Sequence, residues 1–251
     1  MRNSPGGSPD IISDMFTVFG LSDQGCVRPN NEDYFIPDAK AGIFILADGM
    51  GGAKGGEYAS KMSADRLHEL LLITSSDGLD ALSQAFREVN REVREAAKSN
   101  PDLDGMGTTL LVARAVGDSQ LEIGSVGDSR AYLCSKGTLS RITEDQTWVA
   151  EVGSRLGLSD EALRKHPMRH VLTMAVGSAE DLRVYSTTVR LEHGDQILLC
   201  SDGLYGVLDE KMLASALDSE KTLPEKCHYL VDAAKAEGGP DNITVVLIQL
   251  V

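Results

Sequence analysis

Cysteine, positive charge and long hydrophobic runs are all scarce in this 251-residue sequence. Its four cysteines are widely separated and form no C-x-x-C pair, which favours reduced thiols in a cytoplasmic protein over a disulfide framework. With 38 acidic against 24 basic residues, the formal net charge of −14 argues against nucleic acid or an anionic membrane as the main partner. No apolar run of roughly 18 residues and no signal-peptide core is present, so no membrane attachment is expected.

Several familiar catalytic motifs are missing as well. No cysteine is followed by arginine six positions later, so the C-x5-R loop of tyrosine phosphatases is absent, and no G-x4-G-K-[ST] segment marks a P-loop NTPase. His166 and His170 are four residues apart, but Pro167 lies between them and no H-E-x-x-H is formed, so both are expected to be exposed. The Asp-x-Asp at residues 102–104 follows a polar segment, whereas an aspartyl-phosphate nucleophile needs an apolar strand before it.

The length of the sequence and the way its composition changes along the chain predict one catalytic domain. Residues 1–14, rich in Pro, Gly and Ser, are expected to form a disordered lead-in, and residues 15–251 a single domain. Residues 146–177 are charged and irregular, and we interpret them as a flap inserted beside the functional site, with a short helix near residues 160–165. The chain could equally be a catalytic piece of a longer protein.

Hydrophobic periodicity predicts several short strands and three long helices. Helices are expected at residues 56–72, 79–99 and 224–236. Strands are expected at residues 16–20, 42–47, 108–115, 121–126, 130–134, 184–189, 196–200 and 243–250. Hairpin-like turns at residues 116–119, 127–129 and 135–137 favour antiparallel pairing. This order predicts an α+β fold with sheets packed on each other and helices outside, and it lacks the β-α-β alternation of a doubly wound sheet.

Three aspartates at the ends of strand-like runs are the most informative residues. Asp48 and Asp202 each follow an apolar run and precede glycine, whereas Asp241 immediately precedes the final strand. Because one strand's end lies beside the next strand's start in antiparallel neighbours, all three can reach one edge of the sheets. Converging carboxylates repel each other unless a cation lies between them, and oxygen-only ligands suit Mg²⁺ or Mn²⁺. Taken singly, each Asp-Gly pair is also compatible with a plain turn.

Other polar residues extend this candidate site. Asp128, in a short turn between strands, is a fourth candidate ligand, although a plain turn would also explain it. Arg28 offers a planar donor fork that matches phosphate oxygens, with a solvated loop arginine as the alternative. Glu32 and Asp33 can hold metal-bound water.

Taken in chain order, these segments resemble the metal-dependent protein phosphatases (PPM, the type 2C serine/threonine phosphatases), and Met50 after Asp-Gly resembles the bacterial branch. The resemblance implies an αββα sandwich, in which two packed antiparallel β-sheets are flanked by helices and carry the metal site, with its flap, at one edge. The matching segments span nearly the whole chain, at residues 22–33, 47–52, 107–109, 126–132, 143–145, 171–173, 198–204 and 240–244.

The resemblance also implies a set of metal ligands. Asp48 would bridge two Mn²⁺ or Mg²⁺ ions, and the carbonyl of Gly49 would bind one of them. Asp202 and Asp241 would bind the other ion. Asp128 would match the carboxylate of a weaker third ion that it shares with Asp202.

Two further residues would act on the substrate side. Glu32 matches a residue that binds metal through water, and Arg28 matches the arginine that binds the substrate phosphate. A water between the two ions would then attack phosphorus in line, without a phosphoenzyme, because paired ions lower the pKa of water and stabilise developing charge.

The sequence departs from the family pattern at two places. Animal relatives carry a histidine, a proposed acid for the leaving group, where Met50 stands, and methionine cannot donate a proton. Met174 and Val176 stand where many bacterial members have Arg and Leu, which puts a flap role for that arginine in doubt.

The predicted function is therefore that of a serine/threonine phosphoprotein phosphatase, a cytoplasmic monomer that acts on phosphorylated proteins and opposes a serine/threonine kinase. Two alternatives stay open. A pseudophosphatase that serves as a binding or sensor module should have lost a metal carboxylate, and none is missing here. A metal-dependent phosphatase of small phosphorylated molecules would be favoured by a deep pocket.

Overall fold

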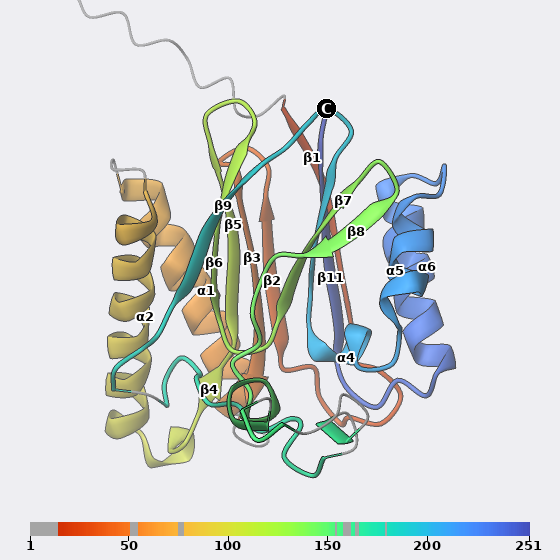
Figure 1. Ribbon diagram of the computed structural model, residues 1–251. Helices are drawn as coiled ribbons and strands as arrows, with labels where there is room; N and C mark the ends of the chain where they lie inside the picture. Colours follow the sequence, from red (N-terminus) through yellow and green to blue (C-terminus); the bar gives the residue numbers. More distant parts are fainter. Residues whose placement is uncertain are drawn as a thin grey trace, which may run out of the picture.

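Two antiparallel β-sheets pack face to face in the computed structural model, and helices cover both outer faces (Figure 1). The structure describes residues 15–50, 55–74, 78–153, 155–157, 162–163, 166–178 and 180–251. This arrangement confirms the predicted αββα sandwich. The lead-in predicted at residues 1–14 lies outside the described residues.

The first sheet has the strand order β1-β11-β10-β7-β8, and the second has the order β2-β3-β5-β6-β9, with β4 paired to β3. The first comprises β1 (Phe16–Asp23), β7 (Arg130–Ser135), β8 (Thr138–Arg141), β10 (Gln196–Cys200) and β11 (Ile243–Leu250). The second comprises β2 (Asp33–Asp38), β3 (Ile43–Met50), β4 (Gly107–Thr108), β5 (Leu110–Val116), β6 (Gln120–Val126) and β9 (Tyr185–Arg190).

The core has three apolar layers, and the central strands contribute to two of them. In β3, Phe44 and Leu46 point between the sheets, whereas Ile43, Ile45 and Ala47 point toward the helices. The strand β11 divides its side chains between the inter-sheet layer and the other helical layer in the same way. Successive strand residues face opposite sides, so a central strand covered on both faces must be apolar throughout.

Long helices cover each sheet. The second sheet is covered by α1 (Gly55–Ile73) and α2 (Leu79–Ser99), and the first by α5 (Glu210–Leu217) and α6 (Leu223–Ala236) (Figure 1). Short turns of helix are α4 (Asp202–Tyr205), η2 (Pro101–Leu103) and η3 (Val149–Gly153). No helix in the described part of the chain is long and apolar enough to span a bilayer.

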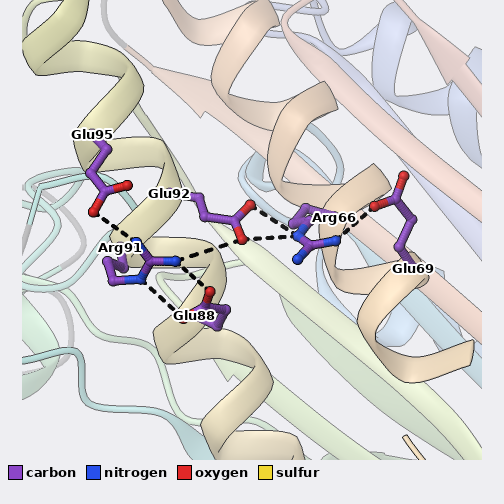
Figure 2. Close-up of polar contacts among 6 residues, drawn as sticks. All are labelled: Arg66, Glu69, Glu88, Arg91, Glu92 and Glu95. Carbon is purple, nitrogen blue, oxygen red and sulfur yellow. Dashed lines mark hydrogen bonds and ion pairs between the residues drawn. The ribbon is translucent and has the colours of Figure 1, made fainter. Parts of the chain in front are cut away.

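An ion-pair network joins α1 to α2 on the outer surface (Figure 2). Arg66 on α1 donates to Glu69 on its own helix and reaches Glu92 on α2, with N–O distances of 2.9 Å in both pairs. Next to Glu92, Arg91 is held by Glu88 and Glu95. These pairs fix the two helices side by side at their solvent faces.

Several elements differ from those predicted. The turn at residues 127–129 is not a hairpin, because it carries the chain from β6 in one sheet to β7 in the other. The strand predicted at residues 108–115 is interrupted at Thr109: Thr108 instead joins Gly107 in the separate strand β4, which pairs with Gly49 and Met50. The strands β2 and β8 and the helices α4 and α5 were not predicted. The helix predicted near residues 160–165 lies mostly outside the described residues.

Candidate metal and phosphate site

A cavity of about 810 Å³ opens at one edge of the sandwich. The C-terminal ends of β3 and β10 and the N-terminal end of β11 lie at this edge. The lining of the cavity includes seven residues nominated from the sequence: Arg28, Glu32, Asp48, Gly49, Asp128, Asp202 and Asp241. Asp33, also nominated, does not line the cavity and lies opposite Asp48 in the neighbouring strand. Arg169, His170 and Leu172, from the segment predicted as a flap, also line the cavity.

Strand pairing brings the acidic residues together from distant parts of the chain. Asp48 lies in β3 opposite Asp33, the first residue of β2. Asp202 follows the end of β10, which pairs with the start of β7 on one side and of β11 on the other. Asp128 precedes β7 and Asp241 precedes β11, so antiparallel register places both beside Asp202.

Gly49 is required by close backbone packing rather than by a turn. It lies within β3 and pairs with Thr108. A Cβ atom at this position would lie 2.2 Å from the carbonyl oxygen of Gly56 and 2.7 Å from that of Glu32. The amide of Gly49 donates to the Glu32 carbonyl at 3.1 Å, which fixes the loop that carries Arg28 and Glu32 against β3.

Like charges dominate the electrostatics of the cavity. Burial raises the pKa of Asp48 well above its usual range, and the nearby carboxylates of Asp33 and Asp202 raise it further. Burial, followed by the charges of Asp128 and Asp241, raises the pKa of Asp202 to about 8. The pKa values of Asp33 and Asp128 rise to about 6, in both cases mainly through burial.

One arginine and one histidine approach the carboxylates of the cavity. Arg28 Nη2 lies 2.6 Å from Asp241 Oδ2, and this hydrogen bond is the main reason that the pKa of Arg28 is raised. His170 Nδ1 lies 3.8 Å from Asp202 Oδ2. Burial and the charge of Arg169 lower the pKa of His170. One firm ion pair therefore faces an acidic cluster that needs more positive charge than the chain provides at this point.

Hydroxyl groups hold the acidic residues from behind. Asp33 Oδ2 accepts hydrogen bonds from Ser201 at 2.8 Å and from Thr244 at 2.6 Å. The hydroxyl of Thr109 accepts from the amide of Asp48 at 2.9 Å and lies 2.7 Å from the Ser129 hydroxyl. These contacts explain why Ser, Thr and Asp recur beside the site in the sequence.

The donor set fits a divalent cation. Asp33 Oδ1 is buried and has no hydrogen-bond partner among the described residues, which leaves an acceptor beside Asp48 for a bound water or ion. All the candidate ligands are oxygen atoms, the type that Mg²⁺ and Mn²⁺ prefer. Within the described ranges, no three His, Cys, Asp or Glu side chains are gathered closely enough to form a ready coordination shell, so an ion would have to draw the carboxylates inward.

Two of the flap residues at the cavity, Arg169 and His170, were not nominated from the sequence. The sequence analysis expected His170 to be exposed, and its side chain is 58% accessible, but it nevertheless lines the cavity. No motif marked it, because its position depends on the path of the flap and not on periodicity.

Comparison with known proteins identifies the family. The profile of the protein phosphatase 2C family matches residues 28–245. The chain belongs to the protein phosphatase 2C family. It is 37% identical over 236 residues to the serine/threonine phosphatase stp of Listeria innocua, covering 91% of this chain and 93% of that protein. It is also 36% identical to the serine/threonine protein phosphatase PstP of Mycobacterium tuberculosis, covering 92% of this chain and 44% of that longer protein.

Solved structures of phosphatases share the fold of this protein phosphatase 2C. The crystal structure of Mycobacterium tuberculosis PstP/Ppp superposes with a TM-score of 0.86 at 35% identity, covering 94% of this chain and 99% of that one. The S. agalactiae serine/threonine phosphatase gives a TM-score of 0.88 at 33% identity, covering 94% and 100%. These matches confirm the predicted family, its fold and the predicted class of function, a serine/threonine protein phosphatase of the bacterial type.

Proposed function

We propose that this phosphatase hydrolyses phosphoserine and phosphothreonine in proteins with the help of two divalent ions, Mn²⁺ or Mg²⁺, bound in the cavity at the sheet edge. Asp48 and the carbonyl of Gly49, together with Asp202 and Asp241, would hold the ions, and Asp128 would hold a weaker third. The observation that carries this proposal is the gathering of all these oxygen ligands and of Arg28 in one cavity.

A solved relative supports the metal requirement. The catalytic domain of PstP, 34% identical to this chain and similar at a TM-score of 0.84, is described as a complex with two manganese ions. When bound, such ions polarise a phosphoryl group and lower the pKa of water at the site. Glu32, whose pKa is raised mainly by burial, would hold water at the margin of the cavity.

Arg28 would bind and orient the phosphate. Its guanidinium is half exposed, lines the cavity and uses Nη2 for Asp241, so its other N–H groups would donate to two oxygens of a bound phosphate. If Asp241 bound an ion instead of Arg28, Nη2 would also be free to donate to the substrate phosphate.

The leaving group receives no help from position 50. Met50 lines the cavity, but its thioether carries no proton to donate. We propose that the proton for the serine or threonine alkoxide comes from water, or that the leaving group departs with less help.

The names of the relatives suggest the substrates of this protein and the kinase that it opposes. Those named above are serine/threonine phosphatases, so we propose phosphoproteins as substrates, in preference to small phosphorylated molecules or a purely binding role, with a serine/threonine kinase acting on the same targets. We further propose that residues 15–251 act as one catalytic domain, that residues 146–177 form its flap, and that the protein works as a cytoplasmic monomer.

The decisive experiment is hydrolysis of a phosphothreonine peptide by the purified chain, measured as phosphate release with Mn²⁺ and with excess EDTA. Asp202→Ala should abolish activity, whereas Asp232→Ala, an exposed acid on α6 that serves as the matched control, should not. Activity that persists in EDTA or in Asp202→Ala would overturn the metal proposal. No release by a folded wild-type chain in saturating Mn²⁺ would overturn the proposed reaction for that substrate.

A further inference from the structure

The loop between β1 and β2, residues 24–32, is tied at both ends to one buried side chain. Asn242 immediately precedes β11 and is only 6% exposed. Its side-chain nitrogen donates to the Gln24 carbonyl at 2.9 Å and to the Asn30 carbonyl at 2.8 Å. Its Oδ1 atom accepts a hydrogen bond from the amide of Glu32 at 2.9 Å. The two ends of the loop therefore meet on a single amide group.

The chemistry of these three bonds explains why the residue is asparagine. A side-chain amide offers two N–H donors and an acceptor oxygen on one rigid plane, and here both donors and the acceptor are used by the loop. An aspartate at position 242 would offer no donor to the two carbonyls. An alanine would leave two carbonyl oxygens and one N–H of the loop without their partner, which is costly where water is excluded.

Further contacts extend this tie to Arg28 on one side and to Asp241 on the other. The side chain of Gln24 donates to the Arg28 carbonyl at 2.7 Å, and the amide of Asn242 donates to Asp241 Oδ1 at 2.9 Å. Gly25 packs so closely that a Cβ atom there would lie 2.1 Å from the Asp241 carbonyl oxygen. Because the loop is held by its backbone, these bonds persist whichever way the guanidinium of Arg28 turns.

We propose that Asn242, acting together with Gln24, is the positioning residue that holds Arg28 at the distance from the carboxylates that a phosphate must span. This role rests on the phosphate-binding function proposed above for Arg28. Asn242 has no N–H group left for a phosphate, so its effect passes through the loop. A donor that is already held in place loses less conformational freedom when it binds. Loosening the loop should therefore weaken phosphate binding more than it slows the chemical step.

The test is a double-mutant cycle on the hydrolysis of a phosphothreonine peptide in saturating Mn²⁺, with wild type, Asn242→Ala, Arg28→Ala and the variant that carries both. It measures KM and the inhibition constant of inorganic phosphate. Asn242→Ala should raise both constants about tenfold and change kcat by less than about threefold. In the Arg28→Ala background, the same replacement should change both constants by less than about twofold, because its effect depends on Arg28.

Two further variants separate positioning from a general loss of stability. Glu122→Ala removes a buried polar contact on β6, outside the cavity lining, and should leave both constants within about twofold of wild type. Gln24→Ala changes an exposed side chain, so the fold should tolerate it, and it removes only the bond to the Arg28 carbonyl. It should raise the inhibition constant of phosphate about threefold.

The outcomes distinguish this role from the proposed reaction. Unchanged constants in Asn242→Ala, or equal increases with and without Arg28, would overturn the positioning role and leave the reaction standing. If Asn242→Ala does not fold, unchanged phosphate inhibition in Gln24→Ala would overturn it. Wild-type constants in Arg28→Ala would overturn the phosphate-binding function of Arg28, and this role with it. No phosphate release by wild type would overturn the proposed reaction itself.

Discussion

Two buried groups of charge in this protein are built on opposite principles. In the second sheet, Arg114 on β5 lies directly opposite Glu122 on β6, and both side chains are about 5% accessible. Arg114 donates to Glu122 through two of its nitrogens. At the cavity, by contrast, the buried Asp33 and Asp128 and the half-buried Asp48 and Asp202 gather with no buried cation between them among the described residues.

The comparison shows how a pair of charges that serves the fold differs from a cluster of charges that serves binding. Buried ions of opposite sign neutralise each other inside the fold, so neither needs anything from solution. Buried ions of one sign raise each other's pKa and leave the fold dependent on protons or on a cation from outside. A strongly acidic pocket of this kind is characteristic of a binding site and not of a core.

The sharpest test removes one carboxylate from the cavity. Asp48→Asn should lower kcat/KM for a phosphothreonine peptide by about 1,000-fold or more, equivalent to about 4 kcal/mol of transition-state stabilisation, because Asp48 would touch both ions. The metal-free protein should be no less stable than wild type, since a repelling charge is lost. Steady-state kinetics and thermal unfolding in EDTA measure the two quantities, with the exposed Asp118→Asn as control. If Asp48→Asn lost stability but kept full activity, Asp48 would be a structural residue and not a metal ligand.

Breaking the paired charges should have the opposite outcome. Glu122→Ala leaves Arg114 buried without its counterion, so the free energy of unfolding should fall by about 3–5 kcal/mol. Enzyme that remains folded should keep its kcat in saturating metal. Replacing both partners together, as Arg114→Met with Glu122→Leu, should recover most of the stability. Urea titrations would measure this, and a double variant as unstable as Glu122→Ala would show that the pair is needed for more than neutrality.

Acidity provides a third, smaller test. A carboxyl whose pKa is raised by folding contributes stability below its unfolded pKa of about 4, and that contribution is lost as pH rises through the folded pKa. Here the folded pKa values are about 6 for Asp33 and Asp128 and about 8 for Asp202. In EDTA, the thermal unfolding midpoint should therefore fall between about pH 5 and pH 8.

Saturating Mn²⁺ should flatten this pH dependence, because a bound cation replaces the protons. Asp202→Asn in EDTA should flatten it in part. A thermal unfolding midpoint that rises steadily with pH in EDTA would show that the aspartates of the cavity do not destabilise the metal-free fold when they ionise.

The smallest effect is expected at the surface network of Figure 2. Arg66→Met removes the link from α1 to Glu92, but the Arg66 side chain is already one-third accessible, and exposed pairs contribute only about 0.2–1 kcal/mol. The loss should shrink further in high salt, which screens exposed charges. Urea unfolding at low and high ionic strength measures both. A loss equal to that of Glu122→Ala would mean that burial does not decide the strength of these pairs.

The sequence was sufficient for the elements whose patterns are strong. The strand β3 and the strand β11 are apolar on both faces, and α2 has a clear helical period that ends before Pro101. The predicted sandwich followed from these runs and from the family resemblance. The acidic residues could be found because strand ends and starts meet at one edge of an antiparallel sheet.

The elements that were missed lie mostly at edges or are very short. The strand β2 contains Pro37 and begins with an acid, which is tolerated because β2 is the edge of its sheet. The strand β8 is a polar edge strand of four residues. The crossing from one sheet to the other at Gly127 could not be predicted, because a two-residue turn and a short crossover look alike in sequence. His170 was missed because only the folded path of the flap brings it to Asp202.

The position of β11 has a consequence for how the protein is made. It pairs with β1 and with β10, so Ser22 and Thr244, separated by 222 positions, lie in hydrogen-bond contact. On a ribosome the first sheet cannot close until residues 243–250 have emerged, and β1 must wait for its partner while all the residues between Asp23 and Ile243 are made. Contacts of such long range slow folding and leave strand edges open to other chains. This phosphatase should therefore become active only after β11 has joined β1 and β10, and should depend on chaperones most while β11 is still missing.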